Sequence, residues 1–211
     1  MKKIVVFPFL ILMAFMLMSC QTTGNNTSAK STGFKKGEIV NGKDGKPVLY
    51  RNQTIDIAID ISSTAVVLPP ESLSALTADA KNVDFVMSHL DSTGATVMVS
   101  VENLGQELVE MDDRMVTELL MESPMFVGTI SDQLEQSLES RGYTVNDVYV
   151  DELEFMGETV LAFRLEGALG EMHIDYLVIF TKVGQYLRGV IVGATKYEYC
   201  LEQVAKIGHY R

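Results

Sequence analysis

Glu171, His173 and Asp175 are the residues of this chain that come nearest to a chemical site. They alternate along a segment with strand periodicity, so their side chains share one face. Alternate residues of a strand can hold a metal ion, and carboxylates often support a ligating histidine. The same pattern is also typical of a solvated strand end. We favour the solvated end, and therefore predict no catalytic residue, no cofactor and no metal ligand.

Methionines along one predicted helix raise a thioether site for cuprous copper as a second hypothesis. Met111 and Met115 stand about one helical turn apart, and Met121 and Met125 follow. Because these positions lie on or near the apolar face of the helix, we interpret them as core residues. We also interpret Cys200 as a buried, unreactive thiol, since it falls on a helix face without a histidine near it in sequence.

Paired carboxylates do not predict a hydrolase here. Asp56 and Asp60 point the same way along one predicted strand, which separates them by about 13–14 Å. The two carboxylates of a glycosidase lie only about 5–9.5 Å apart. The sequence also shows no nucleophile elbow, phosphate-binding loop or Ser/His/Asp arrangement. These observations favour a protein that is not an enzyme.

The stretch from Thr159 to Ala194 must position the residues of the first candidate site. It is predicted to form three strands, joined by turns at residues 167–170 and 184–185. The last strand, Tyr186 to Ala194, is apolar on both faces at its centre. Because such a strand needs cover on both sides, we predict helices on each face of the sheet. The expected fold class is α+β, an antiparallel sheet inside an α/β/α sandwich.

The rest of the chain is predicted from periodicity and turn residues in the same way. We expect a loose hairpin, five further strands and three helices, with one or two helical turns at residues 71–79. The hairpin spans residues 38–51. The strands span residues 54–61, 66–68, 83–90, 95–102 and 145–155, and the last of them has a bulge near Asp151 and Glu152. The helices span residues 106–122, 131–141 and 197–207.

The first twenty residues have the pattern of an export signal. Residues 1–3 form a short basic start with Lys2 and Lys3. Residues 4–18 carry no charge, and this run is shorter than the roughly 20 apolar residues of a spanning helix. The segment ends in Leu-Met-Ser-Cys at residues 17–20, which resembles the lipobox of bacterial lipoproteins, although Met18 departs from the usual small residue. The resemblance implies cleavage before Cys20 and acylation of its thiol. An ordinary signal peptide with a chance cysteine is the alternative.

The chain then divides into an anchor and a domain. We predict a signal peptide at residues 1–19, a lipidated Cys20 with a flexible polar tether at 20–36, and one globular domain at 37–211. Two or more acyl chains hold a protein stably on a bilayer. Gln21 is not the aspartate that commonly retains lipoproteins at the inner membrane. An outer membrane facing the periplasm is therefore favoured, and the cell membrane stays an alternative.

The net charge argues against two kinds of binding partner, and the cysteine count argues against an internal disulfide. The formal net charge is −11, and removal of Lys2 and Lys3 with the signal would make it −13. Such an acidic balance argues against binding of nucleic acid, and against binding of anionic lipid through the domain itself. Acylation of Cys20 would leave Cys200 as the one unmodified thiol, so no internal disulfide is predicted.

The order of these elements resembles the PsbP-like fold, found also in DcrB-type bacterial lipoproteins. A strand pair ends at a proline at residues 54–70, and a hairpin leads into a long helix. A second helix precedes the closing sheet, where a Gly-containing turn and strand at 157–165 are followed by an aromatic-rich meander at 176–192 and a terminal helix. The resemblance covers about Gly37 to Arg211. It implies an antiparallel sheet between helices, and it carries over no functional residue.

The resemblance also implies an accessory role, because members of this superfamily mostly bind protein partners. We therefore predict an envelope lipoprotein, anchored to the membrane through acylated Cys20, that acts as a non-catalytic accessory or protein-binding module. Its partner would be another envelope protein. The alternative is a small envelope enzyme or metal-binding protein that uses the strand face of Glu171, His173 and Asp175.

Overall fold

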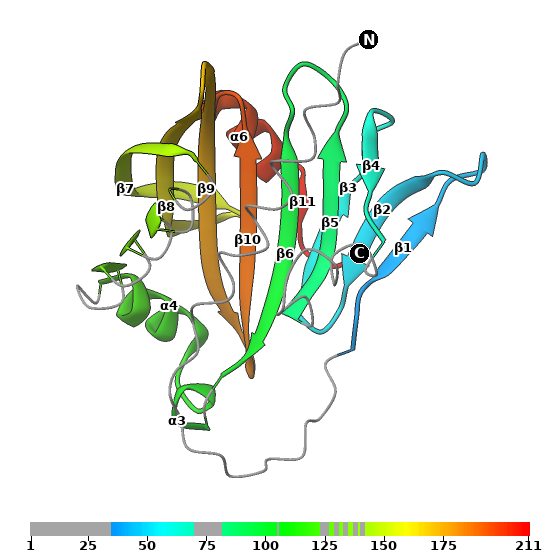
Figure 1. Cartoon of the computed structure of the whole chain (residues 1–211). Coiled ribbons are helices and arrows are strands. Elements are labelled where there is room, and N and C mark those ends of the chain that lie inside the picture. The colour runs from blue at the N-terminus through cyan, green and yellow to red at the C-terminus, as the bar shows by residue number, and fades with distance from the viewer. Residues whose placement is uncertain are drawn as a thin grey trace.

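The computed structural model describes residues 35–69, 82–104, 106–122 and 142–211, with several positions between 127 and 139. The described elements, in chain order, are β1 (Glu38–Asn41), β2 (Pro47–Asn52), β3 (Ile57–Asp60), β4 (Ala65–Val67), β5 (Val83–His89), β6 (Thr96–Asn103), α3 (Gln106–Val109), α4 (Asp113–Glu122), β7 (Thr144–Phe155), β8 (Glu158–Leu169), β9 (Met172–Val183), β10 (Tyr186–Ala194), α6 (Tyr197–Val204) and β11 (Ile207–Gly208). They form a seven-stranded sheet in the order β4-β5-β6-β10-β9-β8-β7 and a four-stranded sheet in the order β1-β2-β3-β11 (Figure 1).

The predicted meander lies at the centre of the larger sheet. β10 pairs with β9 on one side and with β6 on the other, and all nine of its residues are buried. The prediction of three strands with two turns is therefore confirmed. The first turn is shorter than predicted, because β8 continues to Leu169 and the chain reverses at Gly170, where φ is 62°.

The prediction of an α/β/α sandwich is wrong, because the protein is mostly antiparallel β-structure. One face of the larger sheet is covered mainly by the smaller sheet, and α6 adds only two turns of helix there. Three isoleucines of the early segment, Ile55, Ile57 and Ile59, are fully buried against this face. Alternating apolar residues show that a strand needs cover, but a second sheet supplies that cover as well as a helix does.

The opposite face of the larger sheet carries a second core. Phe163 of β8 and Phe180 of β9 pack edge to face there, with ring centroids 6.4 Å apart. Helix α4 packs against β9 and β8 on the same face, where Val116 is fully buried. Figure 1 shows α4 in front of the sheet and α6 behind it. This placement of α4 is what creates the candidate site.

The helix predicted at residues 106–122 is divided into α3 and α4. Asp112 starts the second helix, since its Oδ1 accepts hydrogen bonds from the backbone N–H of Arg114 at 3.0 Å and of Met115 at 3.2 Å. An aspartate that caps a helix in this way favours a new start at its position. The new start also turns Met115 outward, where it is 49% exposed. The interpretation of Met115 as a core residue is therefore wrong.

Other boundaries also differ from the prediction. β3 begins only at Ile57, after a turn in which Asp56 has a φ of 46°. The bulge in β7 lies between Val145 and Asp147, and not at residues 151–152. The terminal helix ends at Val204, so that residues 207–208 form a strand that pairs with β3.

Several predictions fall on residues that the structure does not describe. These are the signal segment at residues 1–19, Cys20, the tether up to residue 34, the helical turns at 71–79 and most of the helix at 131–141. Within the described ranges, no helix has the length and hydrophobicity that a membrane span requires.

Candidate functional site

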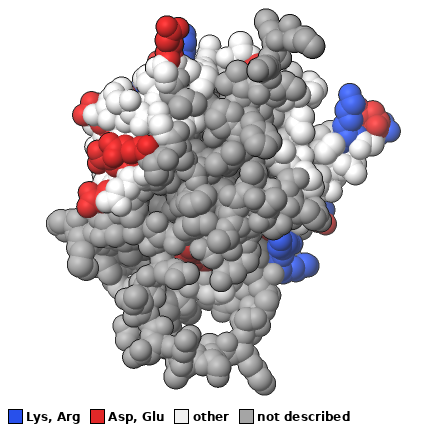
Figure 2. All heavy atoms as spheres, in the orientation of Figure 1, with Lys and Arg blue, Asp and Glu red and all other residues white. Residues whose placement is uncertain are grey.

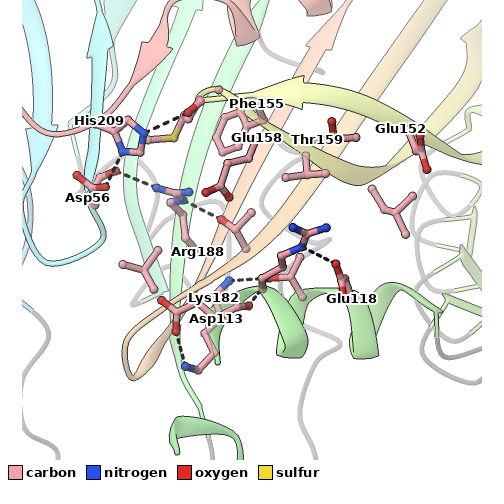
Figure 3. Close-up of a pocket in the computed structure, with 18 residues that line it drawn as sticks. Asp56, Asp113, Glu118, Glu152, Phe155, Glu158, Thr159, Lys182, Arg188 and His209 are labelled. Carbon is pink, nitrogen blue, oxygen red and sulfur yellow. Dashed lines mark hydrogen bonds and ion pairs between the residues drawn. The ribbon is translucent and has the colours of Figure 1, made fainter. Parts of the chain in front are cut away.

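A pocket of about 630 Å³ lies where the β7–β8 hairpin parts from β9 (Figure 3). The pairing of β8 with β9 stops at Ala162 and Ile179, although β8 begins at Glu158 and β9 continues to Val183. Helix α4 fills part of this gap, and the backbone N–H of Lys182 donates to Thr117 Oγ1 at 3.2 Å. The pocket is thus bounded by the hairpin, by α4 and by the ends of β9 and β10.

An ion pair fastens α4 to the wall of the pocket. Lys182 Nζ donates to the carboxylate of Asp113, and also to the backbone carbonyl of Met111 at 2.8 Å. The other carboxylate oxygen of Asp113 accepts from the N–H of Gly184 at 3.2 Å. Because the Lys182 side chain is only 2% exposed, its ammonium group needs hydrogen-bond acceptors of this kind. These contacts serve to position the helix.

Arg188 of β10 is the second buried cation of the pocket and is only 6% exposed. Its Nε donates to Thr181 Oγ1 at 2.9 Å, and its Nη1 donates to the carbonyl oxygens of Ile55 and Asp56, both at 2.9 Å. All three acceptors belong to uncharged groups, and Arg188 makes no ion pair within the described part of the chain. Burial lowers the pKa of Arg188 to about 10, which still leaves it charged at neutral pH.

The rim of the pocket carries the opposite charge. Glu152 and Glu158 are exposed residues of the hairpin that line it, and neither makes a hydrogen bond or ion pair to another described residue. In Figure 3, the side chain of Glu158 lies beside the guanidinium of Arg188. Glu118 is already paired with Arg114, at 2.7 Å. The pocket can therefore receive an anionic group at its base and a cationic group at its rim.

His209 closes one end of the pocket and ties two turns together. Its Nδ1 lies 2.7 Å from Asp56 Oδ2, and its Nε2 lies 3.1 Å from the backbone carbonyl oxygen of Met156. Both partners are acceptors, so the doubly protonated imidazolium fits them best. The hydrogen bond to Asp56 raises the pKa of His209. Desolvation works against the Asp56 carboxylate, but hydrogen bonds from His209 and from the Tyr210 N–H outweigh it and lower its pKa.

These shifts predict a pH-dependent contribution to stability. A raised pKa of His209 in the folded state gives a contribution that is fully present below the unfolded value of about 6.5 and is lost as pH rises through the folded value. We expect His209→Gln to remove this dependence. Urea midpoints measured from about pH 5.5 to 8.5 should fall more steeply for the wild type than for the variant. Parallel profiles for the two proteins would contradict the assignment.

No protein-family model and no curated protein matches the chain. LpqN and Mog1p are among the solved structures that show a distant similarity. LpqN, described as involved in cell envelope biogenesis of Mycobacterium tuberculosis, is 10% identical, covers 74% of this chain and 83% of its own, and has a TM-score of 0.39. The Ran-binding protein Mog1p of Saccharomyces cerevisiae is 8% identical, covers 82% of this chain and 95% of its own, and has a TM-score of 0.38. Likeness at this distance decides neither family nor function, so the resemblance to PsbP-like proteins stays a prediction.

Glu171, His173 and Asp175, the first candidate site of the sequence analysis, lie at the other end of β9 from the pocket. His173 Nε2 and Asp175 Oδ2 are 3.0 Å apart, as their shared face predicts, while Glu171 lies exposed in the turn before them. The structure adds Arg164, whose guanidinium stacks over the Tyr197 ring at 4.0 Å and lies 3.8 Å from Asp175 Oδ1. Across the described ranges, no group of three His, Cys, Asp or Glu side chains is placed to hold a metal ion.

Cys200 is fully buried, as predicted, and burial raises the pKa of its thiol. Sequence reasoning missed the two cations of the pocket. The available signal was that Lys182 and Arg188 interrupt otherwise apolar strands on either side of the Gly184 turn. A buried charge in a central strand needs a specific partner, and that need marks a candidate site.

Proposed function

We propose that the protein is a non-catalytic binding module of the bacterial cell envelope, and that it holds an anionic group of its ligand or partner on Arg188. A guanidinium has five N–H donors, and three of them are directed at Thr181 Oγ1 and two backbone carbonyls. Its Nη2 has no acceptor within the described part of the chain. A carboxylate or phosphate matches such a guanidinium in both charge and geometry.

The exposed carboxylates at the rim support a ligand of mixed charge. An anion bound to Arg188 would bring its neighbouring atoms close to Glu152 and Glu158, which line the same pocket. A positive charge a few bonds away from the anion would offset the repulsion between the anion and this rim. A peptide end, or a small molecule with both an acid and an amine, has this pattern.

The cell-envelope part of the proposal is supported by the sequence. The uncharged segment at residues 4–18 and the Leu-Met-Ser-Cys ending at 17–20 have the order of a lipoprotein signal. Acylation of Cys20 would hold the domain at a membrane surface, where the pocket would meet other envelope components.

Replacement of Arg188 is the direct test. The probe is N-acetyl-lysine, which has one carboxylate and one ammonium group, and its binding is followed by shifts of backbone amide signals. We expect Arg188→Met to weaken binding by at least about tenfold, because the carboxylate of the probe would then be buried without a cationic partner. Arg188→Lys should rescue it only in part, since lysine cannot make a bidentate contact.

Two controls make this test specific. Arg114→Met removes a rim cation that is already paired with Glu118, and it should leave the affinity within about twofold. The methyl amide of N-acetyl-lysine lacks the carboxylate and should not bind the wild type. Equal binding of the probe by the wild type and by Arg188→Met would refute the proposal.

A further inference from the structure

The outer edge of β7 is a long strand edge without a described neighbour. β7 ends the seven-stranded order, and among the described strands it pairs with β8 alone, from Thr144 to Phe155. An edge of this kind presents backbone N–H and C=O groups that another strand can use. The opposite edge of the sheet is β4, which has only three residues. Short edges give little room for pairing, so β7 is the edge that a partner can extend.

The form of β7 suits the addition of a strand. It has twelve residues and no proline, and its bulge lies near its beginning, between Val145 and Asp147. The remainder, from residue 147 to 155, keeps a regular register with β8. Tyr149 and Val150 point to opposite faces, and both are 39% exposed. A partner strand would therefore find apolar contacts on both faces of the edge.

The charge of the edge selects the partner. β7 contains Asp147, Asp151, Glu152 and Glu154 and no lysine or arginine. Figure 2 shows acidic side chains along the side of the molecule where β7 lies. Like charges placed opposite each other destabilise a strand pair, so antiparallel pairing of two copies through β7 is disfavoured. Lysine or arginine in a partner strand would instead meet these carboxylates.

We propose that β7 is the docking site for an extended, basic segment of a partner protein, which adds to the larger sheet as a further strand. Backbone hydrogen bonds along residues 147–155 would supply the affinity, and contacts with the acidic side chains would supply the specificity. Glu152 and Phe155 of β7 also line the pocket, but the docking surface uses the backbone edge of β7 and not Arg188 of β10, so Arg188→Met tests the pocket and not this edge.

Peptide binding to the full chain in detergent micelles tests this proposal. The probe is a ten-residue peptide of alternating lysine and valine. One control peptide alternates lysine with proline, which keeps the charge but removes N–H donors, and another alternates glutamate with valine. We expect the lysine–valine peptide to bind at least about tenfold more tightly than either control. Its binding should slow amide hydrogen exchange in β7, between residues 147 and 155.

A charge-reversal pair locates the binding site. Glu154→Lys, an exposed change on β7, should weaken binding of the lysine–valine peptide about three- to tenfold. Asp44→Lys makes the same change of charge in the β1–β2 turn and should alter the affinity less than about twofold. Equal affinity for the lysine–proline peptide would mean simple charge attraction and would overturn the proposal. Absence of binding, or protection of β1 or β4 instead of β7, would overturn it as well.

Discussion

Replacing Phe180 with alanine is expected to lower the free energy of unfolding by about 3–5 kcal/mol. Phe180 lies in β9 and is only 8% exposed, and its ring packs edge to face with Phe163. A domain of this size has a total stability of about 5–15 kcal/mol, so the loss is a large part of it. The measurement is the urea midpoint at an unchanged denaturant slope, since a changed slope would indicate a different unfolded state.

Two other replacements should each lower the free energy of unfolding by less than Phe180→Ala does. Val150→Ala changes a half-exposed residue of β7, and it should cost less than about 1 kcal/mol. Asp56→Ala removes the acceptor of His209 and of the Tyr210 N–H, so it should cost about 1–2 kcal/mol. If Val150→Ala proved more damaging than Phe180→Ala, the assignment of buried and exposed positions in the sheet would be wrong.

Removal of the Asp113 carboxylate is expected to lower the free energy of unfolding by about 3 kcal/mol. This value is at the low end of the range for breaking a buried ion pair, because Asp113 itself is half exposed. The Asp113→Ala variant leaves the buried ammonium of Lys182 with only the Met111 carbonyl. It also removes the acceptor for the Gly184 N–H. Helix α4 should then loosen from β9, and both the urea midpoint and the probe affinity of the pocket should fall.

A double variant separates loss of charge pairing from loss of packing. Asp113→Ala combined with Lys182→Met contains no unpaired buried charge and should regain a large part of the stability. Asp112→Ala, next in the chain, removes only the cap of α4 and should cost about 1 kcal/mol. A double variant no more stable than Asp113→Ala alone would show that the unpaired charge is not what destabilises the protein.

The sequence by itself determined the strands of the larger sheet. Alternating apolar residues define β8 and β9, and the Gly184 turn fixes where β9 reverses into β10. The apolar centre of Tyr186–Ala194 also predicted correctly that this strand is buried on both faces. These features are local, because strand period and turn conformation depend on residues that are neighbours in the chain. Burial of Cys200 followed from helix periodicity in the same way.

Only the tertiary structure decided what covers the sheet and where the pocket lies. Periodicity states that a face needs apolar cover, but a sheet and a helix meet that need equally, and here the isoleucines at 55, 57 and 59 bring a second sheet. The pocket arises because β8 pairs with β9 only from Ala162 onward and its first residues, 158–161, stand away from β9, which no local pattern encodes. Its contacts join residues far apart in the chain: Asp56 and His209 are 153 positions apart, and Arg188 lies 133 from Ile55. Such contacts depend on how separate elements pack, since the free energy that places them comes from burial of surfaces shared between those elements.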